Sequence, residues 1–423
     1  MKPKISHLLF TSLAFASLAS SSCDHHEKVP VNGDLPDPIV ITLRAEEKEM
    51  LQADQQFAFD FFTRIFDAEA TGKDRTFMVS PLSLSMALAM TRNGAAGETE
   101  AAMTSALKLT PFGDETAINS YYKKLREALL GTDPSTRLSI ANSIWTNRHV
   151  AIKPFFIDAN RDYFQSTVEA VDFSNAATVG RINEWAADNT RNLIDHVLDE
   201  TDPMALMYLL NAIYFKGVWT SQFDKKQTRK APFSHENGLV SQVDMMRQKA
   251  EFSYSENTTM QMVELPYGNQ AFHMVVLLPK PGKKLTDINA LLRDGNTWGN
   301  LNRGLRSAMV DLQLPRFKTE YNVRLNDLLT DMGMGIAFSP GVADFSRMSD
   351  ADAFISFVDQ FTYISTDEEG TEAAAVTVVG VELTSIQEPR NITFHANRPF
   401  IYLIREKSTG AILFMGAVKN VAE

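Results

Sequence analysis

ALMYLLNAIYF, residues Ala205–Phe215, is a nearly continuous apolar stretch that is interrupted only by Asn211. A run of this length that is rich in aromatic and branched residues is typical of a strand whose two faces are both buried. The stretch therefore predicts that a central strand lies between two covering layers.

The patterns on the two sides of this stretch differ. Upstream, Glu46–Phe66 and Ile182–Leu198 place their apolar residues on one side of a helix. Downstream, Phe400–Arg405 and Ile412–Val418 flank the turn sequence Lys407–Gly410, which predicts a β-hairpin. Helices come mostly first and strands mostly later, and this order indicates an α+β fold.

Length and composition indicate one large globular domain. The 423 residues include 27 Phe, which is enough material for a sizeable core. Neither a linker-like stretch nor an internal repeat follows residue 46, so we expect one domain over residues 46–423. The net charge of −11 argues against nucleic acid as a partner, because phosphate binding needs a basic face.

Residues 1–22 have the layout of a secretory signal peptide. Lys2 and Lys4 precede the apolar run Leu8–Leu18, and small residues follow at 19–22. The run is too short to span a bilayer comfortably as a permanent helix. We therefore expect that this segment is removed and that the protein is exported.

The single cysteine, Cys23, directly follows these small residues. This position resembles a bacterial lipobox, although Ser20 stands where lipoboxes usually carry an apolar residue. A lipidated Cys23 would attach the protein to a membrane at the cell envelope or surface. The alternative is a plain secreted, extracellular protein with an incidental cysteine. Residues 23–45 are polar and turn-rich and predict a flexible tether.

The sequence contains none of the usual catalytic motifs. G-x-S-x-G, H-E-x-x-H, a Walker loop and G-x-G-x-x-G after a strand are all missing. Ser80 precedes a proline and an apolar helix, where capping is a better explanation than nucleophilic attack. His25 and His26 lie in the tether, so we expect no metal site and no cofactor. A scattered Ser-His-Asp triad stays open, but the protein is not expected to be an enzyme.

The segment Gly370–Pro389 has two contrasting faces if it is read as a strand. One face holds only small and apolar or β-branched residues: Thr371, Ala373, Ala375, Thr377, Val379, Val381 and Leu383. The other face carries the charges, with Glu372, Ala374, Val376, Val378, Gly380 and Glu382. The segment could enter a sheet with one face buried and its charges outside. An alanine-rich helix start or an ordinary edge strand is the alternative.

From about residue 50 to its end, the chain resembles the serpin family. The resemblance is carried by blocks in the expected order: Val79–Ser83, Ala87–Met90, Gly94–Thr99, Ala141–Trp145, Ile182–Trp185, Asn211–Trp219 with Phe223, Val263–Gly268, Leu314–Phe317, Arg398–Phe400 and Phe414–Gly416. It implies a serpin fold with three β-sheets, about eight or nine helices and an exposed reactive-centre loop. No cofactor is implied, and a monomer is expected.

The resemblance also implies how the protein acts. Serpins are irreversible suicide-substrate inhibitors of serine proteases, with cysteine proteases as a further class of target. The protease attacks the loop and forms a covalent acyl-enzyme, and the cleaved loop then inserts into the main sheet as an added strand. A bulky or charged residue on the inserting face would slow insertion, and the inhibitor would become a substrate.

The resemblance places roles on individual residues. The hinge of the loop comprises Glu368, Gly370, Thr371, Glu372, Ala373, Ala374 and Ala375. The region where the sheet opens comprises Ser80, Ser83 and Asn211 at its centre, with Trp219 and Arg316 where the hinge enters. We expect an ion pair between Arg316 and Glu368. Gln360 stands where many serpins carry a histidine, so the opening network must differ here.

Spacing from the hinge places the cleaved bond at Thr384–Ser385, and counting back from Phe394 also permits either adjacent bond. The residue that enters the protease's main pocket is small or apolar in each case. This favours elastase-like or subtilisin-like targets over trypsin-like ones, whose buried aspartate would stay unpaired. Two alternatives remain: a non-inhibitory serpin that acts as a binding protein, and an unrelated surface hydrolase.

Overall fold

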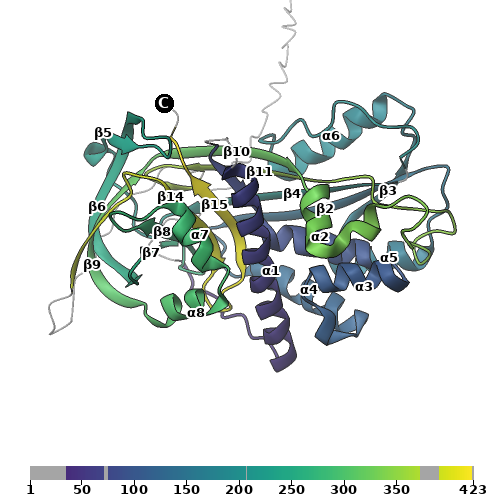
Figure 1. Ribbon diagram of the computed structural model, residues 1–423, viewed down its shortest axis with the longest axis horizontal. Helices are drawn as coiled ribbons and strands as arrows, with labels where there is room; N and C mark the ends of the chain where they lie inside the picture. Colours follow the sequence, from purple (N-terminus) through teal and green to yellow (C-terminus); the bar gives the residue numbers. More distant parts are fainter. Residues whose placement is uncertain (1–34, 71–74, 206, 372–389, 422–423) are drawn as a thin grey trace, which may run out of the picture.

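The structure is a computed structural model that describes residues 35–70, 75–205, 207–371 and 390–421. These residues form nine α-helices and fifteen strands, which confirms the predicted α+β class (Figure 1). The helices are α1 (Ala45–Ala70), α2 (Pro81–Arg92), α3 (Gly97–Ala106), α4 (Glu115–Gly131), α5 (Pro154–Phe164), α6 (Ala177–Thr190), α7 (Leu285–Leu292), α8 (Gly295–Arg303) and α9 (Asn326–Leu329). The strands are β1 (Phe77–Val79), β2 (Arg137–Asn147), β3 (Thr167–Val171), β4 (Met207–Val218), β5 (Arg229–Ser234), β6 (Val240–Glu256), β7 (Met260–Tyr267), β8 (Phe272–Pro279), β9 (Arg306–Pro315), β10 (Phe317–Arg324), β11 (Val358–Thr366), β12 (Gly370–Thr371), β13 (Asn391–His395), β14 (Phe400–Glu406) and β15 (Ile412–Val418).

One sheet has six strands in the order β10-β11-β12-β4-β2-β3. Its central strand β4 is the predicted apolar stretch, and all but one of its residues are buried. Side chains alternate between two cores: Leu209 and Ile213 pack with α2, whereas Tyr208 and Leu210 pack in a smaller cluster with α6. Figure 1 shows α6 on the opposite side of these strands from α2. The prediction of a strand covered on both faces is confirmed.

The other sheet has nine strands, including the predicted hairpin β14–β15. The 17-residue strand β6 pairs with β5 near its start and with β7 near its end, while β9 runs along most of it. The long strand β6 therefore joins the strands that pair near its start and those that pair near its end into one hydrogen-bonded sheet. A shorter strand would leave them as two sheets. As a result, the described strands form two sheets where three were expected.

One predicted helix ends earlier than its apolar pattern. The pattern continues to Leu198, but α6 ends at Thr190 because Arg191 and Asn192 both adopt a positive φ. Ile194 and Val197 are nevertheless buried in the cluster beneath α6. The pattern indicated burial correctly, and the backbone conformation decided where the helix stops.

The end of the predicted tether lies on the body of the protein. Ile41 and Leu43 are buried, and the carbonyl oxygen of Ile39 accepts a hydrogen bond from the Thr132 hydroxyl at 2.8 Å. Residues 1–34 and Cys23 lie outside the described ranges. Among the helices within those ranges, none is both long and apolar enough to cross a membrane.

Candidate functional site

The six-stranded sheet has an incomplete seam between β4 and β11. The two strands pair directly and in parallel over Leu209–Ala212 and Val358–Phe361. Further along, the short strand β12 lies between them and is antiparallel to both. The seam is therefore closed at one end of the sheet and occupied by two residues of the predicted hinge at the other.

Gly370 lets the hinge enter this seam. It pairs with Val218 of β4, and Thr371 pairs with Gly217 and with Thr366. A Cβ atom on Gly370 would collide with the carbonyl oxygen of Gly217. A glycine is required here because the backbone of β4 approaches too closely for any side chain.

The turn that precedes β12 is held by backbone hydrogen bonds. The amide of Trp219 donates to the Glu369 carbonyl at 2.8 Å, and the amide of Phe223 donates to the Glu368 carbonyl at 2.9 Å. The Trp219 indole Nε1 donates to the Asp367 carbonyl at 2.9 Å. The segment after β4 therefore fixes the position from which the hinge starts.

Arg316 and Glu368 form the predicted ion pair. The guanidinium donates through Nε and Nη2 to both carboxylate oxygens, at distances of 2.7 to 3.0 Å. The Glu368 side chain is 1% exposed and also accepts from the Thr228 hydroxyl. Burial alone would raise the pKa of Glu368, but the hydrogen bonds from Arg316 and Thr228 outweigh it and lower that pKa. The carboxylate is thus a buried, ionised anchor at the hinge.

Thr371 is the last described residue before the loop, and its side chain is fully buried. Its hydroxyl lies 2.6 Å from the Tyr267 hydroxyl. The Tyr267 ring stacks on Trp219 with a centroid distance of 4.3 Å. The inserting face thus begins with a residue that is already in the core.

A second group of polar residues lies at the closed end of the seam. The side chain of Gln360 on β11 forms two hydrogen bonds with the backbone of Ser80: its Oε1 accepts from the amide and its Nε2 donates to the carbonyl, both at 2.9 Å. Ser80 caps α2, and its hydroxyl donates to the Leu413 carbonyl at 2.7 Å. Gln360 therefore ties the sheet to the start of this helix.

Asn211 completes this group from the other side of the seam. Its Nδ2 donates to Asn142 Oδ1 at 2.6 Å and to the Ser83 carbonyl at 3.2 Å, and also contacts the Ser83 hydroxyl. Its Oδ1 accepts a longer bond of 3.4 Å from Gln360, its direct neighbour across the seam. Because all these groups are buried, separating β4 from β11 would break a satisfied network.

The structure brings the sequence-predicted residues together in two clusters. Ser80, Ser83 and Asn211 form the central cluster, and Trp219, Arg316, Glu368, Gly370 and Thr371 meet at the hinge. The sequence predicted no role for Asn142, Thr228 or Tyr267, although Asn142 and Tyr267 lie in blocks that resemble the family. Glu372, Ala373, Ala374, Ala375, Thr384 and Ser385 lie outside the described residues.

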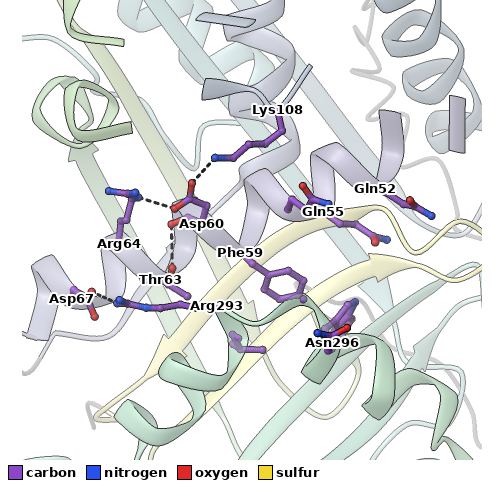
Figure 2. Close-up of a pocket in the computed structure, with 14 residues that line it drawn as sticks. Gln52, Gln55, Phe59, Asp60, Thr63, Arg64, Asp67, Lys108, Arg293 and Asn296 are labelled. Carbon is purple, nitrogen blue, oxygen red and sulfur yellow. Dashed lines mark hydrogen bonds and ion pairs between the residues drawn. The ribbon is translucent and has the colours of Figure 1, made fainter. Parts of the chain in front are cut away.

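A separate cavity of about 830 Å³ lies beside α1 (Figure 2). Its charged side chains are paired with one another: Asp60 contacts Arg64 and Lys108, and Asp67 contacts Arg293. None of its lining residues belongs to the two clusters above. Within the described ranges, no group of three or more His, Cys, Asp or Glu side chains is arranged to hold a metal ion.

Comparisons with known proteins agree on one family. The model of the family described as serpin (serine protease inhibitor) matches residues 52–421. A protein of Thermococcus kodakarensis named as an uncharacterised serpin-like protein is 34% identical over 380 residues, which cover 89% of this chain and 86% of that protein. Leukocyte elastase inhibitor of Equus caballus is 32% identical over 382 residues, 87% and 98% of the two chains. The crystal structure of human thyroxine-binding globulin superposes with a TM-score of 0.80 at 27% identity, over 90% of this chain and 100% of that one.

Proposed function

This chain belongs to the serpin family, and from that premise we propose that it traps serine proteases by inserting its cleaved loop between β4 and β11. The family contains protease inhibitors, such as leukocyte elastase inhibitor, and also thyroxine-binding globulin. The observation that carries the inhibitory proposal is the position of β12, which already lies in the seam that the loop must enter.

The trapping reaction uses the protease's own chemistry. The protease serine oxygen attacks the carbonyl carbon of Thr384, and the bond from Thr384 to Ser385 breaks. The amine of Ser385 leaves with a proton from the protease's histidine, and Thr384 stays bound as an ester. Trapping succeeds if insertion moves the ester away before water hydrolyses it.

The pairing of β12 supports one register for the proposed insertion. It is antiparallel to both neighbours, so each further hinge residue moves one position back along β4 and along β11. Six residues beyond Thr371, the strand would place Thr377 opposite Asn211 on one side and opposite Gln360 on the other. Asn211 and Gln360 are direct partners in the closed seam, so both edges give the same register.

This register explains how the central network would accommodate the loop. Thr377 shares a face with Thr371, because six positions along a strand return the side chain to the same side. Its hydroxyl would take the place between Asn211 and Gln360, which now share their longest hydrogen bond. A small hydroxyl-bearing residue can satisfy both amides, whereas a charged one would leave a buried charge unpaired.

Insertion also supplies the driving force. About a dozen inserted residues would add roughly ten ladder hydrogen bonds at ~1 kcal/mol net each. At about 3.3 Å per residue, roughly fourteen residues would carry the protease on the order of 45 Å. The intact form is therefore held by a kinetic barrier, to which the hinge and central clusters both contribute.

A denaturing gel tests the proposal. The protein is incubated with pancreatic elastase, subtilisin or trypsin, and the released peptide is sequenced from its N-terminus. We expect an SDS-stable band of summed mass with elastase or subtilisin, and a released peptide that begins at Ser385. A stable complex with trypsin alone, cleaved at Thr384, would contradict the assigned specificity.

Two other outcomes distinguish the alternatives. Clean loop cleavage without a complex with any of the three enzymes would support a non-inhibitory binding protein. Hydrolysis of a substrate by this protein alone would support an enzyme. We further propose that the protein acts as an exported monomer, attached at the cell surface if Cys23 is lipidated.

A further inference from the structure

Arg126 on α4 is a buried cation whose guanidinium is only partly satisfied. Its side chain is 4% exposed, and Nη1 donates to Gln165 Oε1 at 2.9 Å. Within the described residues, Nε and Nη2 are buried without a hydrogen-bond acceptor. The Glu127 carboxylate lies 3.7 Å from Nη2 and is half exposed. One edge of the guanidinium therefore has no hydrogen-bond acceptor among the described residues, and its nearest counter-charge is the Glu127 carboxylate.

The same edge binds a carboxylate elsewhere in this protein. Arg316 holds Glu368 through Nε and Nη2, and Arg324 holds Asp359 through Nε and Nη2 at 2.9 Å. These two nitrogens form a planar fork that matches the two oxygens of a carboxylate. Burial lowers the pKa of Arg126, and the attraction of the Glu127 carboxylate 3.7 Å away opposes this effect only in part. Arg126 thus presents a fork for an anion that the described residues do not supply.

A cavity of about 330 Å³ lies next to this guanidinium. It lies beside Leu138–Asn142 of β2, just before the stretch Ser143–Asn147 that pairs with β3 among the described strands. Figure 1 shows β2 and β3 at this edge with α6 on one side and α4 on the other. The cavity has a mixed lining: Leu130, Leu138, Ile140 and Trp185 are apolar, and Ser139, Gln165, Thr167 and Asn189 are polar.

We propose that this cavity is a binding site for a small organic carboxylate. The carboxylate would bind the Nε–Nη2 fork of Arg126, and an apolar body would lie against Trp185 and Leu138. A phosphate fits less well, because its second negative charge would meet no further cation in the lining. The volume suits a ligand of roughly the size of a benzoate, at the lower end of small-molecule sites. The site lies outside the hinge cluster, and its lining includes Asn142, which accepts a hydrogen bond from Asn211 of the central cluster. The proposal concerns binding alone and does not rest on protease inhibition.

Benzoate is a suitable probe, with benzamide as its neutral counterpart of nearly equal shape. Isothermal titration calorimetry on the full chain would compare the wild type with Arg126→Lys, which keeps the charge but removes the fork. Arg161→Lys is the matched control, because Arg161 on α5 is exposed and lies outside the cavity lining. Ala141→Leu fills the cavity without changing a charge.

We expect the wild type and Arg161→Lys to bind benzoate with equal affinity and not to bind benzamide. Arg126→Lys should bind at least about tenfold more weakly, as expected when a bidentate contact is lost. If Arg126→Lys does not fold, Ala141→Leu still decides, because it should abolish binding in a folded protein. Absence of benzoate binding to the wild type in the millimolar range, or equal binding to Ala141→Leu, would overturn the proposal.

Discussion

At the scale of single residues, the buried carboxylate of Glu368 joins the turn before β12 to Arg316 and Thr228. Its side chain is 1% exposed, whereas that of Arg316 is 43% exposed, so the pair is only partly shielded from water. The pKa of Glu368 lies below its ordinary value of 4.5. The anchor therefore contributes its full stability above about pH 4.5 and loses it as the pH falls through the lowered pKa.

Arg316→Ala would leave Glu368 buried without its cation. We expect a loss of stability of about 1–3 kcal/mol, toward the lower end because Arg316 is partly exposed. The intact variant should also lose inhibitory activity faster on warming, since less restrains the hinge. Residual activity after timed heating measures this effect.

Arg324→Ala is the matched control for that experiment. Arg324 forms the same two-pronged contact with Asp359, whose side chain is 10% exposed, but it lies away from the hinge. We expect this variant to be less stable without an accelerated loss of activity at temperatures below its unfolding. If Arg316→Ala decays at the wild-type rate, the pair does not restrain the hinge.

The residues of the site were only partly accessible from the sequence. Resemblance to known blocks identified Ser80, Ser83 and Asn211, and spacing marked Gln360 as a departure. The sequence could not show that Gln360 bonds to the backbone of Ser80, because the two are 280 positions apart. Thr228 was missed for the same reason, since only the fold brings its hydroxyl to Glu368.

At the scale of elements, the seam between β4 and β11 would accept the loop only as an added strand between the two. β12 is antiparallel to both neighbours, and if the loop continued in this register, every second hinge residue would be buried. Ala373 would share the buried face with Thr371, whereas Ala374 would point to the opposite face. Neighbouring alanines therefore offer a comparison in which only the face differs.

Ala373→Glu should convert the inhibitor into a substrate, because insertion would have to bury an unpaired carboxylate. Ala374→Glu should inhibit nearly as well as the wild type. The stoichiometry of inhibition, measured by titrating elastase or subtilisin, should rise several-fold for the first variant only. Equal stoichiometries for the two variants would show that the inserted strand does not follow this register.

The elements themselves were largely predictable from hydrophobic patterns. The run in β4, the β14–β15 hairpin and the amphipathic α1 were all expected, since periodicity reports burial directly. The early end of α6 was not, because two left-handed residues interrupt a pattern that stays apolar. The joining of sheets through β6 was missed because strand pairing is non-local.

At the scale of the whole molecule, one buried carboxylate couples stability to pH. Asp54 of α1 accepts hydrogen bonds from the Tyr121 and Tyr122 hydroxyls of α4, at 2.5 and 2.8 Å. Burial raises its pKa from 3.8 to about 6, against the lowering effect of these bonds. The ionised form thus costs the folded state about 3 kcal/mol above pH 6, and this penalty disappears as the pH falls toward 4.

Asp54→Asn should remove this pH dependence. We expect the melting temperature of the variant minus that of the wild type to be larger at pH 7.5 than at pH 5. Asp158→Asn, which removes an exposed carboxylate from α5, controls for the loss of one charge. Differential scanning calorimetry at both pH values measures the effect. An unchanged difference between variant and wild type would mean that Asp54 does not titrate in this range.

Attachment of the molecule to a membrane stays a prediction that rests on Cys23. Growth with labelled palmitate should label the wild-type protein, and Cys23→Ser should remain unlabelled and be released from the membrane fraction. Equal release of both proteins without label would favour the plain secreted form. The folded domain should be unaffected, because residue 23 lies upstream of the described residues.

The proposed inhibition depends most on the capacity of the seam between β4 and β11 to accept the cleaved loop. Calorimetry of the intact and the loop-cleaved protein tests this directly, whichever protease is the natural target. Roughly ten added ladder bonds at ~1 kcal/mol each should raise the unfolding temperature by on the order of 10 °C. A cleaved protein that unfolds at or below the temperature of the intact form would contradict insertion and the proposed mechanism of inhibition.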